Sequence, residues 1–308
     1  MVSLPFRLSW RRMAAVLLLA AGGALGFNQL DAWQRQAIFS PQTDQQRWWR
    51  EPPAGTEVFD LALPNGDKVH AWYWQSPRRD APTVLYLHGA RWNLNGSAFR
   101  MEGWTRMGYS MLAIDYRGFG QSTPLLPSEQ SASQDAAAAL QELARRQPDP
   151  ARRFIYGHSL GGAIAIDLAA RPDLPPFAGL IVESSFTSIG AMLGTMKWGW
   201  VPGATLLVTQ PFASVDKLAA LTTPMLLLHG TADRVVPHTM SDELYRAAQQ
   251  VPADLKRLVK IEGASHSGAI RSGRIYEDAV ADFVRDAGRG YAGRQGAPTP
   301  LTASRPGT

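Results

Sequence analysis

Short apolar runs alternate with helix-forming stretches along most of this 308-residue chain. Residues 57–63 alternate apolar and polar side chains, as a half-buried strand does, and Asn65-Gly66-Asp67 predicts a tight turn into a second strand at residues 68–74. Six nearly continuous apolar runs follow, which is typical of strands buried on both faces of a parallel sheet. They lie at Thr83–Leu87, Ser110–Asp115, Phe154–Tyr156, Leu180–Glu183, Met225–His229 and Leu258–Ile261.

The stretches between these runs predict helices at residues 98–107, 133–146, 160–170, 239–249 and 268–287. Two antiparallel strands followed by about six strand–helix repeats indicate one doubly wound α/β domain with a mostly parallel sheet of about eight strands. We expect this domain at residues 57–288. The remaining segments are expected to be an N-terminal signal-anchor or signal peptide at 1–30, a linker at 31–56 and a disordered Gly- and Pro-rich tail at 289–308.

The net positive charge of the chain comes from its two ends. The chain has 31 Lys plus Arg and 26 Asp plus Glu, a net charge of +5. Residues 1–30 and 289–308 each carry three Arg and no acid, so residues 31–288 hold 25 basic against 26 acidic residues, a net of −1. A nearly neutral body without a Lys/Arg run predicts that nucleic acid is not a partner.

The N-terminal segment has the pattern of an export signal, with an apolar run of 15 residues at 13–27 behind three Arg. A bilayer span needs about 20 residues, so the run is short unless Ser9-Trp10 and Asn28 lie at the interfaces. The helix-compatible stretch from Asn28 to Phe39 favours an uncleaved membrane anchor. Cleavage at Ala24-Leu25-Gly26, and hence secretion, is the alternative, and a buried helix of a soluble protein is a third. Either export interpretation predicts that the body lies outside the cytoplasm, on the periplasmic side in a bacterium.

A candidate nucleophile stands in Gly157-His158-Ser159-Leu160-Gly161, between the apolar strand at 154–156 and a predicted helix. A serine on a tight strand-to-helix turn exposes its hydroxyl at the sheet edge, and the flanking glycines relieve crowding there. The N–H groups at the helix start face developing negative charge. Because the chain has no Cys, thiol nucleophiles, disulfides and Cys-ligated metals are excluded, which leaves Ser159 as the nucleophile.

With this motif the chain resembles the α/β-hydrolase superfamily over about residues 57–287. Within the superfamily it is similar to the membrane-anchored serine hydrolases of the Bem46-like group. The segments that carry the resemblance are Gln34–Pro41, His88-Gly89, Asp115–Ser122, Gly157–Gly162, Glu183–Ser188 and His229–Pro237. The resemblance implies helices on both faces of the sheet, a small cap after strand six, and no metal or organic cofactor. Serine at the turn argues against the epoxide hydrolases and dehalogenases of this fold, because the resembling families use an Asp nucleophile.

A serine hydroxyl attacks only with the help of a neighbouring base that a carboxylate holds in place. The superfamily order of nucleophile, acid and base implies Asp233 as the acid and His266, after the last strand, as the base. His238 is the rival base. Asp242 and Glu183 are the reserve acids, although Asp242 is better placed to cap a helix and Glu183 comes early in the chain.

The oxyanion hole requires two backbone N–H groups. Leu160, directly after the nucleophile, is expected to supply one, and Ala90 after His88-Gly89 the other. Close relatives usually have Asn at the Ala90 position, but a backbone donor tolerates any residue except Pro. Arg91 either faces an anionic part of the substrate or points to solvent.

The segment Ile189–Leu221 is expected to form the cap above the nucleophile. Its apolar residues suit acyl chains, or else they bury the small helices of the cap itself. The expected activity is cleavage of a carboxylic ester or thioester with an acyl or lipid-like group, through an acyl-enzyme. The alternatives are a serine aminopeptidase-like amide hydrolase and an inactive, membrane-tethered binding protein. Expected partners are the ester substrate and a membrane contacted through the N-terminal segment.

Overall fold

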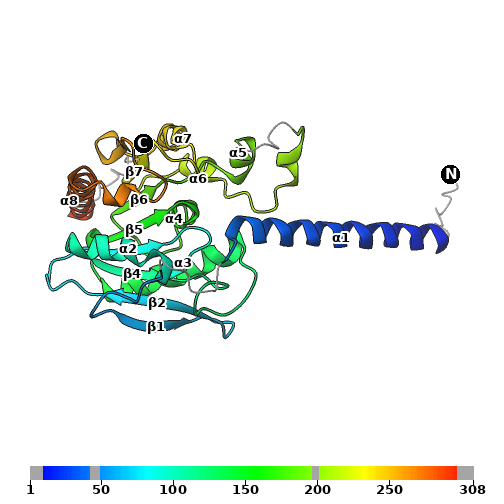
Figure 1. Ribbon diagram of the computed structural model, residues 1–308, viewed down its shortest axis with the longest axis horizontal. Coiled ribbons are helices and arrows are strands. Elements are labelled where there is room, and N and C mark those ends of the chain that lie inside the picture. Colours follow the sequence, from blue (N-terminus) through cyan, green and yellow to red (C-terminus); the bar gives the residue numbers. More distant parts are fainter. Residues whose placement is uncertain (1–9, 42–48, 196–200, 297–308) are drawn as a thin grey trace, which may run out of the picture.

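The computed structural model describes residues 10–41, 49–195 and 201–296. A central sheet carries helices on both faces, and one long helix projects from the body (Figure 1). The sheet has eight strands in the order β1-β2-β4-β3-β5-β6-β7-β8. The pairs β1/β2 and β2/β4 are antiparallel, and every later neighbouring pair is parallel. The predicted α/β fold with a mostly parallel eight-stranded sheet is therefore confirmed.

All eight predicted strands are present within one or two residues of their expected ends. The strands are β1 Glu57–Ala62, β2 Lys68–Trp74, β3 Thr83–Leu87, β4 Ser110–Ile114, β5 Arg153–His158, β6 Gly179–Glu183, β7 Met225–Gly230 and β8 Lys256–Ile261. The α-helices are α1 Trp10–Phe39, α2 Leu94–Arg106, α3 Glu129–Arg146, α4 Leu160–Ala169, α5 Ile189–Gly194, α6 Ser214–Leu218, α7 Thr239–Ala247 and α8 Arg274–Gly296. Short 3-10 turns lie at η1 Pro150–Arg152, η2 Ala204–Leu207, η3 Ala253–Leu255 and η4 Ala269–Arg271.

Alternate residues of the inner strands pack on opposite faces of the sheet, as the two-residue period of a strand requires. On β3, Leu85 belongs to the hydrophobic cluster that contains the buried residues of α3, α4 and α7. Its neighbours Val84 and Tyr86 belong to the cluster that contains those of α2 and α8. Two helical layers therefore enclose the sheet, and only the ends of its strands are left for a site.

The C-terminal helix continues beyond the expected end of the domain. We expected a disordered tail from residue 289, and this is wrong for residues 289–296, because α8 runs to Gly296. Tyr291 packs against the same cluster as the rest of α8, so apolar burial extends past Gly288. Residues 297–308 lie outside the described residues.

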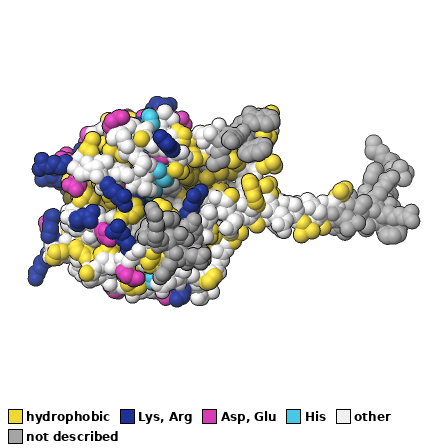
Figure 2. Space-filling view, in the orientation of Figure 1, with side chains coloured by type: hydrophobic (Ala, Val, Ile, Leu, Met, Phe, Trp, Pro, Cys, Tyr) yellow, Lys and Arg dark blue, Asp and Glu magenta, His cyan; other side chains and the backbone are white. Residues whose placement is uncertain are grey.

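The N-terminal helix α1 runs without a break across the expected boundary between residues 30 and 31. Figure 2 shows hydrophobic side chains along its projecting part, where Leu25 and Phe27 are exposed. Within the described segments, no helix combines the length and the apolar character needed to cross a bilayer. The end of α1 is different, because Phe39 is fully buried in the body. The folded body therefore begins within α1 rather than at β1.

The predicted cap after strand six is present and consists of α5, η2 and α6. Part of its apolar surface faces outward, since Leu206 and Leu207 are 87% and 61% exposed. Phe212 is buried in the core instead. Three further apolar cap residues, Met196, Trp198 and Trp200, lie outside the described residues.

Candidate active site

Ser159 occupies a strained turn between β5 and α4. Its φ of 55° and ψ of −120° lie in a region that residues with a side chain rarely adopt. Glycine is needed on both sides of this turn. A Cβ at Gly157 would lie 2.2 Å from the carbonyl oxygen of Gly161, and one at Gly161 would lie 2.0 Å from that of Leu87. The sequence motif therefore forms the expected sharp turn, with Ser159 at its tip.

The main chain of β6 and Ser185, two residues after that strand, hold this turn. The N–H of Ser159 donates to the carbonyl of Glu183 at 2.9 Å, and the hydroxyl of Ser185 donates to the carbonyl of Ser159 at 2.8 Å. Both peptide groups of Ser159 are thereby paired. These two hydrogen bonds stabilise the strained conformation of the turn.

Asp233 and His266 lie together at the ends of β7 and β8. Oδ2 of Asp233 is 2.8 Å from Nδ1 of His266. The other carboxylate oxygen accepts the N–H groups of Val235 and Val236 at 2.8 and 2.9 Å. The carboxylate is fully buried, whereas the imidazole of His266 is 17% exposed. A buried carboxylate thus orients an accessible imidazole, which is the relation that the sequence predicted.

A second histidine contacts the same carboxylate. Nε2 of His229 lies 3.1 Å from Oδ2 of Asp233. Burial alone raises the pKa of the Asp233 carboxyl, but hydrogen bonds from His229 and His266 more than offset this and bring that pKa below its usual value. Asp233 therefore stays ionised at neutral pH. His229 is the last residue but one of β7 and lies four residues before Asp233, and the sequence analysis gave it no role.

His158 connects the turn that carries Ser159 to the loop that carries His266. Its Nε2 lies 2.9 Å from the carbonyl oxygen of His266, and the two ring centroids are 4.9 Å apart. Burial, together with the nearby charge of Arg100, holds the pKa of His158 well below its usual value. His158 is therefore neutral and can donate its Nε2 proton to the His266 carbonyl. The sequence analysis gave His158 no role.

Ser159 follows His158, whose ring contacts the loop that carries His266. Across the described residues, its hydroxyl makes no hydrogen bond to the imidazole of His266. Catalytic hydrogen bonds of this kind are often long in unliganded enzymes and shorten when the substrate binds. The structure thus brings Asp233 and His266 into direct contact, and His158, the residue before Ser159, links the loop of His266 to the turn.

The rival candidates have other partners. The carbonyl of His238 accepts a hydrogen bond from Lys260, and Asp242 pairs with the same Lys260 at 3.1 Å. Glu183 is buried against Arg100, with Oε1 and Nη1 2.7 Å apart. Each of these groups is already occupied in an ion pair or a hydrogen bond away from Asp233 and His266.

Glu183 is also the centre of a buried polar network under the nucleophile turn. The hydroxyls of Tyr156 and Tyr276 donate to its Oε2 at 2.6 and 3.0 Å, and Arg100 contacts its Oε1. A buried carboxylate with three charged or polar donors is well satisfied. Since the main-chain carbonyl of Glu183 holds the N–H of Ser159, this network fixes β6 beneath the nucleophile.

The loop after β3 passes next to the nucleophile. A Cβ at Gly89 would lie 3.3 Å from Cβ of Ser159, so a side chain here would crowd the turn. Ala90 follows directly, and Arg91 has a φ of 74°. Leu160 is the first residue of α4, where N–H groups lack partners within the helix. Leu160 follows Ser159 directly and Ala90 follows Gly89, which approaches Ser159 closely, and oxyanion donation by their N–H groups stays a prediction.

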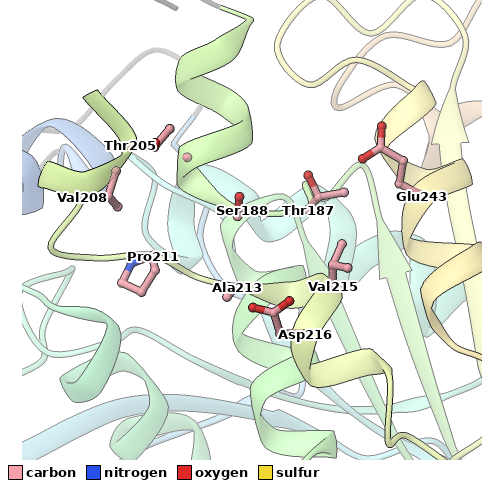
Figure 3. A pocket seen from close by; sticks show the side chains of 10 residues that line it. Thr187, Ser188, Thr205, Val208, Pro211, Ala213, Val215, Asp216 and Glu243 are labelled. Carbon is pink, nitrogen blue, oxygen red and sulfur yellow. The ribbon is translucent and has the colours of Figure 1, made fainter. Parts of the chain in front are cut away.

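A pocket of about 380 Å³ opens beside the cap (Figure 3). Thr187 and Ser188, which follow β6, form one wall, and Val208, Pro211 and Val215 supply apolar surface. Two carboxylates, Asp216 of α6 and Glu243 of α7, complete the lining. Over the described ranges, no group of three His, Cys, Asp or Glu side chains is arranged to hold a metal ion.

The comparison with known families decides the assignment of the chain. The family model Hydrolase_4, described as "Serine aminopeptidase, S33", matches residues 78–214 and 194–269. The chain belongs to this family. It is a member of the α/β-hydrolase superfamily, and the resemblance to the Bem46-like group is confirmed.

Relatives and solved structures of the family extend the picture. A Mycobacterium tuberculosis protein of uncharacterized function, MT2364, is 32% identical over 89% of this chain and 94% of its own. The lysophosphatidylserine lipase ABHD12 of Danio rerio is 31% identical over 77% of this chain and 65% of its own. The Pyrococcus furiosus esterase Pf2001 has the same fold, with a TM-score of 0.63 at 18% identity over 80% of this chain and 96% of its own. Family membership supports hydrolase activity of the esterase, lipase or peptidase kind.

Proposed function

We propose that this protein is a serine hydrolase that cleaves a carboxylic ester or thioester carrying an acyl or lipid-like group. The single observation that carries the proposal is the contact between buried, ionised Asp233 and accessible His266, next to the strained turn that presents Ser159. A carboxylate that fixes one imidazole nitrogen leaves the other free to accept a proton. No metal ion or organic cofactor is part of the proposal.

In the proposed reaction, Nε2 of His266 takes the proton of the Ser159 hydroxyl as its oxygen attacks the substrate carbonyl. The N–H groups of Ala90 and Leu160 stabilise the negative charge that develops on the carbonyl oxygen. His266 then gives the proton to the departing alcohol or thiol, which leaves Ser159 acylated. Water, deprotonated by His266, hydrolyses the acyl-enzyme. Asp233 stabilises the imidazolium throughout.

We propose the pocket beside the cap as the site of the acyl group; its lining includes Thr187 and Ser188 after β6 but none of Ser159, Asp233 and His266. Val208, Pro211 and Val215 give it apolar walls, and a volume of about 380 Å³ lies within the range of pockets for small organic ligands. Relatives named as a lipase and an esterase fit the same substrate class. We propose that the acyl chain lies between the cap and α7.

A fluorophosphonate probe tests the proposal, because it reacts only with an activated serine. Wild-type protein should be labelled and should hydrolyse p-nitrophenyl esters of increasing acyl length. Ser159→Ala should lose both labelling and hydrolysis. A wild-type protein without labelling, or labelling that survives Ser159→Ala, contradicts the proposal and leaves the inactive binding protein as the better account.

Amide hydrolysis is the second candidate, and two carboxylates favour it. Asp216 and Glu243 line the pocket, where they suit a substrate with a free amino group. The description of the family as serine aminopeptidases, and the shared fold of a puromycin-hydrolyzing peptidase of Mycobacterium tuberculosis (TM-score 0.57, 21% identity over 77% of this chain and 40% of its own), point the same way. Assays with aminoacyl p-nitroanilides against matched esters separate the two. A kcat/KM for anilides above that for esters would replace our first proposal.

We further propose that the N-terminal segment anchors the protein to a membrane, with the catalytic body outside the cytoplasm. Exposed apolar side chains on the projecting part of α1 and the three Arg at positions 7, 11 and 12 support this. Fractionation of cells expressing the full chain, followed by protease treatment of intact spheroplasts, tests it. Digestion of a membrane-bound body supports the anchor. A soluble protein that lacks residues 1–26 indicates cleavage and secretion instead.

A further inference from the structure

The last turns of α1 contact two separate parts of the proposed active site. One is the loop after β3, which carries Ala90, and the other is the cap segment that leads from η2 toward α6. Both contacts are made by residues between Asp31 and Phe39, far from the catalytic motifs in sequence. In Figure 1 the base of α1 meets the body on the side where α5 lies.

The contact with the loop is a main-chain hydrogen bond. The carbonyl of Phe39 accepts the N–H of Arg91 at 2.8 Å. Arg91 has a φ of 74°, a conformation that a residue with a side chain adopts only when its surroundings hold it there. Phe39 is itself fixed, because its buried ring packs against Phe119 and Phe212 at centroid distances of 6.4 and 5.9 Å. The direction of the peptide before Arg91 therefore depends on Phe39.

The contact with the cap is made by one side chain. Nε2 of Gln34 donates to the carbonyl of Leu207 at 2.7 Å, and its Oε1 accepts the N–H of Thr209 at 2.9 Å. Gln34 is 9% exposed, so both hydrogen bonds are shielded from water. One turn earlier, Asp31 accepts the side-chain amide of Gln210 at 2.8 Å. These bonds hold the segment that contains Val208, a wall of the pocket.

We infer that Phe39 and Gln34 are positioning residues of the active site: Phe39 fixes the oxyanion loop, and Gln34 fixes the cap wall of the substrate pocket. The inference rests on the proposed roles of Ala90 and of the pocket. The end of α1 then belongs to the structure that positions the active site. The same helix is the one that we propose reaches a membrane. The inference also requires any processing of the N-terminus to spare residues from Asp31 onward.

The two positions should give different kinetic effects. Displacement of an oxyanion donor weakens binding of the transition state but not of the substrate, so it lowers kcat and leaves KM unchanged. A looser cap wall weakens binding of the acyl chain and raises KM for long acyl esters. If Phe39 and Gln34 had purely structural roles, their substitution would lower the melting temperature without separating an effect on kcat from an effect on KM.

The experiment compares Phe39→Leu and Gln34→Ala with Trp33→Ala as the matched control, since Trp33 lies on the same helix and is 67% exposed. Active sites are counted by fluorophosphonate labelling, and kcat and KM are measured well below each melting temperature. Complete loss of an oxyanion donor costs about 10²–10³ in kcat, so Phe39→Leu should lower kcat by about 10-fold or more. Gln34→Ala should raise KM for an octanoyl ester by about 5-fold with little change for an acetyl ester.

Folded Phe39→Leu and Gln34→Ala enzymes with wild-type kcat and KM would overturn the inference, whatever their melting temperatures. An equal loss in Trp33→Ala would also overturn it. If Phe39→Leu fails to fold, the KM effect in Gln34→Ala, whose side chain lies at the edge of the core, decides the outcome. Wild-type protein that is not labelled would overturn the proposed function itself, which distinguishes the two failures.

Discussion

The neutral imidazole of His158 donates to the main-chain carbonyl of His266 across 2.9 Å. The first residue precedes the nucleophile on β5, and the second follows the last strand of the sheet. A single hydrogen bond therefore fixes the distance between the turn that carries Ser159 and the loop that carries the proposed base. Because the site is assembled from the ends of separate strands, hydrogen bonds of this kind determine how accurately its side chains are positioned.

Replacement of His158 by Phe should lower kcat by about 10-fold, because one buried hydrogen bond is lost while the aromatic volume is kept. Stopped assays with a short p-nitrophenyl ester measure the effect. His70→Phe is the matched control, since this buried histidine pairs with Asp60 at 3.0 Å on the far strands of the sheet. A similar loss of kcat in both variants would show that the effect is a general one on folding.

His266→Ala should reduce kcat by at least about 10³-fold, and Asp233→Asn by about 10⁴-fold, because the base is lost or held in the wrong tautomer. His238→Ala should stay within about twofold of wild type, since its polar atoms face Lys260. Steady-state kinetics with an ester substrate measure all three. Activity that persists in His266→Ala and disappears in His238→Ala would refute the assignment of the base.

The fold and the three proposed catalytic positions could be predicted because each depends on local patterns. The inner strands are buried on both faces and therefore appear in the sequence as apolar runs, such as Met225–His229 in β7. The turn at Ser159 needs glycine at fixed positions, so the turn can be recognised directly in the sequence. The proposed order of nucleophile, acid and base comes from the resemblance to the superfamily.

The rest could not be predicted, because it depends on contacts between distant segments. The bond from Arg91 to Phe39 is made by main-chain atoms and leaves no residue preference for either partner. The side-chain direction of His158 depends on where the loop after β8 passes. The contact of His229 with Asp233 could have been predicted, since His229 lies near the end of β7 and four residues before Asp233. Histidines near strand ends, however, also serve as simple turn residues.

Glu183→Gln should destabilise the protein strongly, because it leaves the buried guanidinium of Arg100 without its counter-charge. Breaking a buried ion pair costs about 3 kcal/mol or more, which lowers Tm by roughly 5–10 °C in a chain of this size. Glu102→Gln is the control, since Glu102 pairs with exposed Arg50 at 3.2 Å and such surface pairs contribute below about 1 kcal/mol. Thermal unfolding followed by circular dichroism measures both, and equal Tm losses would contradict the expectation.

Val215→Phe should shorten the acyl chain that the enzyme accepts, because the larger side chain fills part of the pocket. We expect the ratio of kcat/KM for octanoyl to acetyl esters to fall by about 10-fold, with the acetyl value nearly unchanged. Leu206→Gln on the same cap is the control, because Leu206 points outward and does not line the pocket. An unchanged ratio in Val215→Phe would place the acyl chain elsewhere.

The buried carboxyl of Asp115 should make the stability of the protein depend on pH. Burial raises its pKa to about 7, although the N–H of Leu94 at 2.8 Å partly opposes this. Nε2 of neighbouring His88 is 3.4 Å away, and burial lowers the pKa of that imidazole to about 4. Between about pH 4 and pH 7 the folded chain keeps a proton on Asp115 that the unfolded chain releases. This group therefore makes the protein less stable as pH rises through that window.

His88 has the opposite effect between about pH 4 and pH 6.5, because the unfolded chain binds a proton there that buried His88 does not. Comparison of Asp115→Asn with wild type isolates the carboxyl, since both proteins keep His88. The amide introduced by Asp115→Asn does not ionise, so the Tm of the variant relative to wild type should rise by roughly 5 °C from about pH 5 to about pH 8. Asp278→Asn, at an exposed position on α8, should show no such trend. A difference between Asp115→Asn and wild type that stays constant with pH would mean that Asp115 remains ionised in the folded protein throughout.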